Sequence, residues 1–561
     1  MASGDLIRRI YGPFRGVDFR GEEINLARSP ESINMWKDYS KTESIRTRPE
    51  IENIKSFDTT VWGIFSYQVG DEKMLLVHSG TKLYKILGTE KTEIYSGLNP
   101  ARSFSFIFND KWFFKDGLNY LVYDGTTIEE VIGHIPTTSI SRRPQGGGST
   151  YEDVNMLTSF RKNSFVGDGE STEYYLDAQN IDSDYVPEIY VDDVQITTFT
   201  MNAAEGKITF NNAPAAPLTD GQDNVVIQFR KTVPGHRDRI NKCTLLEVFD
   251  NRVFFAGNQD YPNTLWHSSL NDPSYCSDLD YYTEGLDLSM IKSLVASNNA
   301  LWVFKEPSQA NTAVFYHNPV IDAEYGKIYP TTHSSIATGC VGSGINFNDD
   351  IVFFSNRGME AINGDITTEQ AIVHRSSLVD SKLTEETGYA DMVLDEWKGY
   401  LMVFIGRKVY LADSRAMFTN INHYEYEWYY WELPKDVTCT KVIDGTLYIG
   451  TSDGVYTLTD NEAEITSYWT TPIDRFENYQ FLKTTNKKGC VCEAAGDIKL
   501  YVKTNKSEWE EVGKYDSVND YFVGRIKKKK FKDLQIKLLS TSRFSLETIT
   551  IECYVGGYIK R

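Results

Sequence analysis

The sequence lacks any long apolar run. No apolar window of about 18 residues, the length needed to begin spanning a membrane as a helix, occurs in the 561 residues. The first residues, MASGDLIRRIYGPFRG, also lack the uninterrupted apolar stretch of a secretion signal. We therefore expect a protein that is not inserted in a membrane and is not secreted by the usual route.

Cysteines are few and follow no metal-binding pattern. There are seven, an odd number, and no two pairs stand at zinc-site spacing. This argues against a disulfide framework and predicts synthesis in a reducing compartment. Cys490 and Cys492 are two positions apart in an expected strand, so both should point to one face and pack as small apolar residues.

Recognisable catalytic motifs are also missing. The eight histidines are scattered singly, without HExxH, and no GxSxG occurs. We therefore expect no enzyme, no catalytic residue and no cofactor. One metal alternative stays open, because hard oxygen ligands for calcium could come from two acidic clusters, although turn formation explains them more simply. These clusters are Asp182, Asp184, Asp192 and Asp193, and Asp220, Asp223 and Asn224.

Basic charge is in deficit, with 58 Lys and Arg against 78 Asp and Glu and a net charge of −20. A protein that binds nucleic acid needs a basic surface to contact the phosphates, so the acidic composition disfavours that class. The composition remains compatible with a surface past which nucleic acid slides without binding. The one basic run is Arg525, Lys527, Lys528, Lys529, Lys530 and Lys532. It could contact DNA or an acidic partner subunit, or it could be a charged hairpin tip that protects an edge strand.

What the chain does contain is a repeated hairpin. Residues 441–458, KVIDGTLYIGTSDGVYTL, place apolar strands around two Asp-Gly turns. Equivalent corners fall at Asn109, Asn251, Asn299, Asp349, Lys398 and Asp444. From Asn251 onward they are 48, 50, 49 and 46 residues apart, a period typical of β-propeller blades. The sequence predicts an all-β fold with a propeller of about seven blades.

One interval between corners is too long for this period. Asn109 and Asn251 are 142 residues apart, and residues 160–233 hold four strand signals without the aromatic doublets of the blades. Removing 136–235 shortens the interval to 42. This predicts a small β-sandwich domain inserted at residues 137–235, with the propeller formed by 56–136 and 236–465.

Both ends of the chain differ from the repeats. Residues 1–55 are polar and turn-rich, which predicts an extended arm ordered only by packing on another element, with Trp36 buried. Residues 466–561 alternate more tightly and predict a C-terminal β-sandwich-like domain. One of its faces should carry Leu534, Ile536 and Leu538.

Four stretches carry a resemblance to a known family: NMWKDY at 34–39, IRTRP at 45–49, RVFFAGN at 252–258 with the later SY at 274–275, and WYYW at 428–431. They are similar to stretches of the nozzle (tail tubular protein B) and packaged-DNA stabilisation proteins of tailed bacteriophages. The chain departs from that family at Glu50, where a glycine usually follows Arg-Pro.

The resemblance implies a function. Members look like propellers with extra β-domains, assembled as rings beyond the portal and adaptor, where they extend the DNA conduit, help retain packaged DNA and seat fibres. For this chain it implies a structural protein of the virion tail, not an enzyme, made in the host bacterial cytoplasm.

The resemblance also implies partners. They are further copies of the chain in a ring, a hexamer, together with portal-adaptor or other tail subunits, tail fibres, and DNA in transit without specific binding. The candidate subunit contacts are Trp36, Arg46, Arg48, Lys527, Lys528, Lys529 and Lys530.

A second class of function stays open. Trp and Tyr at blade tops could stack on sugars, so the alternative is a carbohydrate-binding or carbohydrate-active propeller, although no paired carboxylates occur at a recognisable motif.

For the conduit we expect a channel lined with excess Asp and Glu, lysines 527–530 directed away from it, and no binding of duplex DNA at physiological salt.

Overall fold

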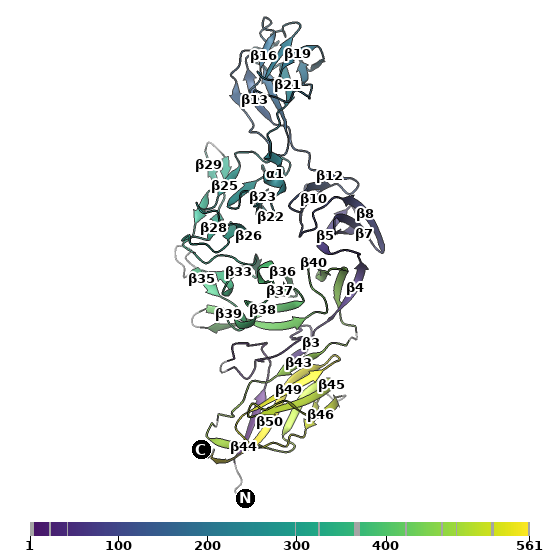
Figure 1. Ribbon diagram of the computed structural model, residues 1–561, viewed down its shortest axis with the longest axis vertical. Coiled ribbons are helices and arrows are strands. Elements are labelled where there is room, and N and C mark those ends of the chain that lie inside the picture. The colour runs from purple at the N-terminus through teal and green to yellow at the C-terminus, as the bar shows by residue number, and fades with distance from the viewer. Residues whose placement is uncertain are drawn as a thin grey trace. The chain divides into compact units, whose positions relative to one another are not determined.

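The computed structural model describes residues 5–21, 24–41, 43–297, 299–323, 326–363, 371–420, 423–461, 464–477, 479–517 and 521–558. Strands dominate these residues, and many small sheets follow one another along the chain (Figure 1). Within them the helical elements are short: α1 (His236–Asn241), α2 (Asp380–Leu383) and the 3-10 turn η2 (Tyr389–Asp391). No helix in the described part of the chain is long and apolar enough to cross a membrane. The prediction of an all-β fold is confirmed.

The chain divides into two compact units. The first comprises Met1–Ser66, Leu75–Gly80 and Ser334–Arg561, and the second comprises Tyr67–Met74 and Thr81–His333. One four-stranded sheet consists of β5 (Val61–Val69), β6 (Glu72–Ser79), β7 (Lys82–Leu87) and β8 (Glu90–Ser96). Its strands are ordered as in the sequence, which is the up-and-down pattern of a propeller blade.

Three four-stranded antiparallel sheets form much of the second unit. They are β9 (Phe104–Phe108), β10 (Lys111–Lys115), β11 (Tyr120–Tyr123) and β12 (Ile128–Glu130); β22 (Leu245–Phe249), β23 (Arg252–Ala256), β24 (Thr264–His267) and β25 (Tyr281–Thr283); and β26 (Ile291–Ala296), β27 (Leu301–Lys305), β28 (Val314–His317) and β31 (Thr331–His333). A hairpin of β29 (Val320–Asp322) and β30 (Gly326–Ile328) separates β28 from β31. Apolar side chains such as Phe113, Phe255 and Trp266 join neighbouring sheets. The propeller prediction is confirmed as a fold type, and the number of blades stays a prediction.

Five of the six predicted hairpin corners, all but Asn299, are tight turns with left-handed backbone. Asn109 and Asp110 have φ of 47° and 58°, and Asp250 and Asn251 have φ of 50° and 58°. The same geometry recurs at Asn348 and Asp349, at Lys398 and Gly399, and at Asp444 and Gly445. Two consecutive positive φ angles are typical of the type I′ turn, which favours Asn, Asp and Gly because they tolerate this conformation.

Two further sheets lie between β12 and α1. One contains β14 (Ser149–Thr150), β13 (Thr137–Arg142), β15 (Phe160–Phe165), β21 (Val225–Arg230), β17 (Glu188–Val191) and β18 (Val194–Ile196), and the other β16 (Glu173–Tyr175), β20 (Lys207–Phe210) and β19 (Phe199–Asn202). Their inward residues, including Phe165, Tyr174 and Phe229, form one buried cluster. We call this pair of sheets the inserted sandwich.

The segment just before β15 leaves the inserted sandwich and packs among the blades. Met156 and Leu157 are buried with Phe255 and Trp266. Asn155 Oδ1 accepts a hydrogen bond from the Cys276 amide at 3.0 Å, and the Met156 amide donates to the Cys276 carbonyl at 2.8 Å. The predicted insertion at 137–235 therefore includes blade residues, because interval arithmetic counts positions and not contacts.

The first unit contains the remaining blade-like sheets. They are β32 (Gly344–Phe347), β33 (Asp350–Ser355), β34 (Gly358–Ile362) and β35 (Ile372–His374); β36 (Val393–Trp397), β37 (Tyr400–Ile405), β38 (Lys408–Asn420) and β39 (His423–Glu432); and β40 (Cys439–Ile443), β41 (Thr446–Gly450) and β42 (Gly454–Thr459), to which β4 (Glu50–Ser56) adds a fourth strand. The predicted arm, 1–55, thus ends in a strand that belongs to the last repeat. Glu50 is extended there, so no turn at this position requires a glycine.

The rest of the arm supplies three more strands. β1 (Leu6–Tyr11) pairs with β50 (Ser545–Tyr558), β2 (Met35–Trp36) pairs with β39 and with β3 (Ile45–Thr47), and β3 continues to β50. Figure 1 shows this purple segment beside the yellow strands. Trp36 is 2% exposed, so its predicted burial is confirmed.

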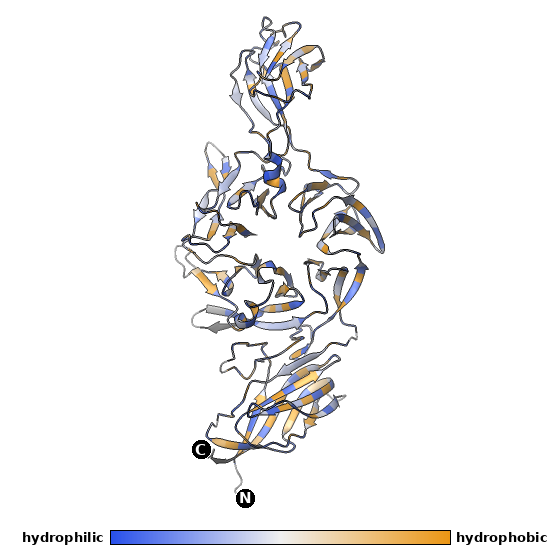
Figure 2. Cartoon of the chain, in the orientation of Figure 1, coloured by the Kyte–Doolittle hydropathy of each residue, from blue (hydrophilic) through white to orange (hydrophobic). Residues whose placement is uncertain are grey.

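The C-terminal strands form two layers that share long strands. They are β43 (Ser467–Thr470), β44 (Phe481–Thr485), β45 (Cys490–Thr504), β46 (Glu510–Ser517), β47 (Tyr521–Gly524), β48 (Lys529–Phe531), β49 (Leu534–Ser540) and β50. Leu534, Ile536 and Leu538 are fully buried on one face, as predicted, and Figure 2 shows such alternation as orange and blue bands. Cys490 and Cys492 also share a buried face, and all seven cysteines are buried and free. We call these strands with β1 the C-terminal sandwich.

Candidate functional site

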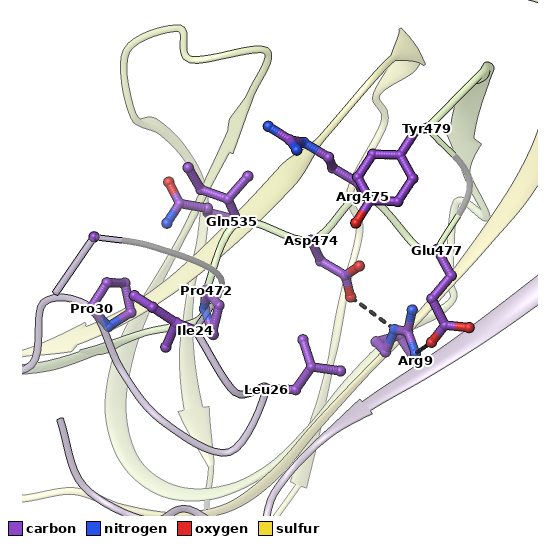
Figure 3. A pocket seen from close by; sticks show the side chains of 12 residues that line it. Arg9, Ile24, Leu26, Pro30, Pro472, Asp474, Arg475, Glu477, Tyr479 and Gln535 are labelled. Atoms are coloured by element: carbon purple, nitrogen blue, oxygen red, sulfur yellow. Dashed lines mark hydrogen bonds and ion pairs between the residues drawn. The ribbon is translucent and has the colours of Figure 1, made fainter. Parts of the chain in front are cut away.

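A pocket opens in the first unit between the arm and the segment that precedes β44 (Figure 3). Its volume is about 440 Å³. One wall is apolar and consists of Ile24, Leu26, Pro30, Pro472 and Ile473. The polar residues are Arg9, Asp474, Arg475, Glu477, Tyr479 and Gln535.

Arg9 is the central polar residue of the pocket. Side chains alternate along β1, which directs Arg9 and Tyr11 towards Asp474. Arg9 Nε donates to Asp474 Oδ2 at 2.9 Å, and Arg9 Nη1 donates to Glu477 Oε1 at 2.9 Å (Figure 3). The Tyr11 hydroxyl donates to the same Asp474 oxygen at 3.0 Å. The arm and the 474–477 segment are thus joined by one charged network.

This network holds Arg9 as a cation. Burial lowers the pKa of Arg9, but its hydrogen bonds and charge interactions with Glu477 and Asp474 outweigh burial and raise that pKa. Burial and the Asp474 charge raise the pKa of Tyr11 well above its ordinary value. Because Arg9 occupies both carboxylates, neither is placed as a free general base.

The remaining surface of the pocket suits binding. Tyr479 is 58% exposed, and the guanidinium of Arg475 lies 5.4 Å from the centre of its ring. An exposed ring beside a fixed charge network and an apolar wall can hold a planar or apolar group. Sequence reasoning missed this site because its residues come from segments more than 400 positions apart.

Two of the predicted subunit contacts are used inside the chain. Trp36 stacks on Trp397 at 5.6 Å and meets Trp431 edge-on at 5.5 Å between ring centres. Arg48 is 4% exposed and donates from Nε to Asn34 Oδ1 at 3.0 Å, and burial lowers its pKa to about 10. Both side chains bind the arm to its own blade, a role different from the subunit contact predicted for them.

The other predicted contacts lie nearer the surface. Arg46 is half-buried, 4.0 Å from Asp38. Lys527, Lys529 and Lys530 are exposed around β48, while Lys528 pairs with Glu510. Three of the four lysines are therefore open to a partner.

Comparisons with known proteins do not identify a family. No protein-family model matches the chain, and no curated protein matches it. Similar solved structures include BamB from Moraxella catarrhalis, at 11% identity and a TM-score of 0.34, covering 73% of this chain and 97% of that chain. PorZ from Porphyromonas gingivalis is 10% identical with a TM-score of 0.26, and the match covers 92% of this chain and 87% of PorZ. The computationally designed protein Ika8 is 10% identical with a TM-score of 0.31, and the match covers 73% of this chain and all of Ika8, 100%. At TM-scores this low, these likenesses carry no argument about the chain.

A second titratable cluster lies beside α2. His374 Nε2 is 2.5 Å from Asp380 Oδ2, and His374 Nδ1 is 3.3 Å from Glu360 Oε2. Burial lowers the pKa of His374, but the two carboxylates outweigh it and raise the pKa to about 10. A histidine kept protonated by two carboxylates is an ion-pair centre and a poor general base at neutral pH.

The acidic clusters considered for calcium mostly make hydrogen bonds within the inserted sandwich. Asp182 accepts from Arg230 and Thr232, and Asp223 accepts from Ser141 and Ser164. Asp192 and Asp193 form a turn, with φ of 49° and 62°. Among the described residues, no three His, Cys, Asp or Glu side chains are grouped to hold a metal ion.

Proposed function

We propose that the chain is a structural protein of a bacteriophage tail, a nozzle or connector-stabilising subunit that forms a ring around passing DNA. The observation that best supports this is that strands of the arm pair with several sheets of the first unit. One segment gives β1 and β3 to β50, β2 to β39 and β4 to β42. The arm is therefore joined to the C-terminal strands by two strand pairings and to the blades by two more.

Pairing of the arm with several sheets suits a subunit that must withstand pressure from packaged DNA. The arm could leave the C-terminal strands only if the six paired positions of β1 and the two of β3 separated. Each pairing is a ladder of backbone hydrogen bonds. The Arg9 network adds charged links between β1 and the 474–477 segment.

The charge of the chain fits DNA that passes without being held. An excess of 78 acidic over 58 basic residues disfavours phosphate contacts, each of which would slow the DNA. In the ring, acidic side chains line the channel and Lys527, Lys529 and Lys530 face a neighbour or solvent. The partners are other tail subunits and fibres, and the site of action is the virion.

Negative-stain images of the purified full-length protein test this proposal. Rings with a central hole are expected, together with no shift of duplex DNA on a gel at physiological salt. A protein that stays monomeric at tens of micromolar, or binds DNA in a salt-sensitive way that Lys527→Gln, Lys528→Gln, Lys529→Gln and Lys530→Gln abolish, would overturn it.

A second candidate function is carbohydrate binding. The exposed Tyr479 ring beside Arg475 and Glu477 favours it, because sugars stack on aromatic rings flanked by polar groups. A glycan array with the full-length protein and its Tyr479→Ala variant tests it. Binding lost in the variant would favour this candidate, and no binding by either protein would remove it.

A further inference from the structure

One sheet of the C-terminal sandwich carries several large apolar side chains on its solvent side. Strands β1, β50, β45 and β47 lie next to one another in that order. Five large apolar side chains on three of these strands are exposed, by 40% to 59%: Leu6, Ile10, Tyr521, Val523 and Tyr554. We call them the outer face.

The strand register brings these residues together. Leu6 lies opposite Tyr554, while Ile10 lies opposite Thr550, which lies opposite Val491, and Val491 lies opposite Val523. Opposite side chains on paired strands are about 5 Å apart, and neighbouring strands are about 4.8 Å apart. The outer face is therefore a band across these strands, in which the Arg8–Glu552 ion pair lies between the row of Leu6 and the row of Ile10, and Glu493 lies opposite Tyr521.

The same strands already use their other face for the core. Cys492, Ile549, Ile551 and Cys553 alternate with the outer-face positions and are buried. A sheet with one layer behind it and water in front is expected to be polar on the water side. Several large exposed apolar side chains gathered on one face of a sheet mark a surface that another molecule covers.

Basic residues border this patch. Thr484 pairs with Tyr554 on one side and with Lys529 on the other, so Lys529 extends the row that Leu6 begins. Arg8, within the patch, is held by Glu552 at 2.7 Å. Residues 481–532 contain 13 Lys and Arg against 7 Asp and Glu, whereas the rest of the chain contains 45 against 71. The outer face thus adjoins a basic region on an acidic chain.

We propose that the outer face docks on an acidic surface of a second copy of this chain. Charge selects the occupant, because the strongly acidic remainder of another copy complements the basic border. Two unlike surfaces meet in such a contact, so each copy can bind the next and the assembly grows into a closed ring or a filament. This rests on the proposed ring and adds which surface builds it.

Sedimentation velocity of the full-length protein between 50 mM and 500 mM salt tests the contact. The apolar variant combines Ile10→Ser with Tyr554→Ser, and the charge variant combines Lys527→Gln, Lys529→Gln and Lys530→Gln. The matched control is Leu218→Ser in the inserted sandwich, where the leucine is fully exposed and away from the patch. We expect the apolar variant to weaken association at least tenfold, the charge variant to weaken it mainly at low salt, and the control to match wild type.

An engineered thiol gives a second readout. All seven native cysteines are buried, so Ile10→Cys offers a maleimide an exposed thiol on the outer face. Labelling is expected to be at least tenfold slower in the assembled protein than in the dissociated protein.

The outcomes separate this inference from the function on which it rests. The docking surface would be overturned, and the ring proposal would stand, if both variants formed rings as the wild type does. The same holds if the Ile10→Cys thiol were labelled equally fast in rings and in monomers. A wild-type protein that remains monomeric at all concentrations would overturn both. Association that strengthens with salt would overturn the charge-selected contact.

Discussion

The inserted sandwich and the C-terminal sandwich are both paired layers of alternating strands, yet they are built differently. The core cluster of the inserted sandwich takes its buried residues from the interval between Phe165 and Phe229. The cluster of the C-terminal sandwich also contains Tyr11 and Trp36 from the arm and Trp431 from a blade. A similar strand pattern can therefore give a self-contained core in one place and a shared core in another, depending on which residues fill it.

Removing residues 1–11 should break the C-terminal sandwich and have the largest effect. The deletion takes away β1 and the fully buried Tyr11, and it leaves the buried Asp474 without Arg9. Stranding a buried charge alone costs about 3–5 kcal/mol. We expect rapid proteolysis after residue 466 with the inserted sandwich still protected, measured by limited digestion and mass spectrometry. A C-terminal region as resistant as in wild type would contradict the shared-core interpretation.

Trp36→Ala and Phe165→Ala form a matched pair that separates the two cores. Both side chains are buried and aromatic, and each truncation should cost about 3–5 kcal/mol. In urea unfolding followed by hydrogen exchange, Trp36→Ala should lower protection in β39 and β50, and Phe165→Ala should lower it only in the inserted sandwich. Loss of protection in both regions by either variant would show that the cores are coupled.

The contact between arm and blade should also depend on pH through Glu427. Burial raises its pKa to about 7, and Arg15, 3.7 Å away, and Arg28 only partly oppose this. The folded state then binds a proton more tightly than the unfolded chain, whose Glu titrates near 4.5. Unfolding free energy therefore falls as pH rises from about 4.5 to 7, by up to about 3 kcal/mol at 1.36 kcal/mol per pKa unit.

Glu427→Gln should remove this dependence. The variant is expected to be more stable than wild type at pH 8 and nearly equal to it at pH 4.5, in urea melts across that range. Glu173→Gln in the inserted sandwich, where the side chain is half exposed, serves as the matched control. Parallel pH curves for wild type and Glu427→Gln would refute the assignment.

The smallest effect is expected from removing most of the inserted sandwich. The Lys231 amide donates to the Ser159 carbonyl at 2.8 Å, so residues 160–230 can be replaced by two glycines while Asn155, Met156 and Leu157 stay in the blade. Stability of the C-terminal sandwich should change by less than about 0.5 kcal/mol. Deleting 137–235 instead removes the blade residues as well and should lower soluble yield. Equal behaviour of the two deletions would count against a self-contained insert.

Strands and turns were predictable from the sequence because their signals are short-range. The alternation of Leu534, Ile536 and Leu538 and the Asp444-Gly445 turn depend on side-chain period and on residues that tolerate positive φ. The burial of Trp36 was predictable because it is a large apolar residue in a segment that has no apolar periodicity and must therefore pack on another element. Spacing alone also indicated that extra chain lies between Asn109 and Asn251.

Only the tertiary structure decided which distant segments meet. β1 is paired with β50, and Arg9 with Asp474, across more than 450 positions. No residue pattern in these segments predicts which segment will be the partner. The pocket and the outer face both depend on those pairings. The physical reason is that strand addition is made by backbone groups common to all residues, so register and partner are selected by the burial of the whole fold.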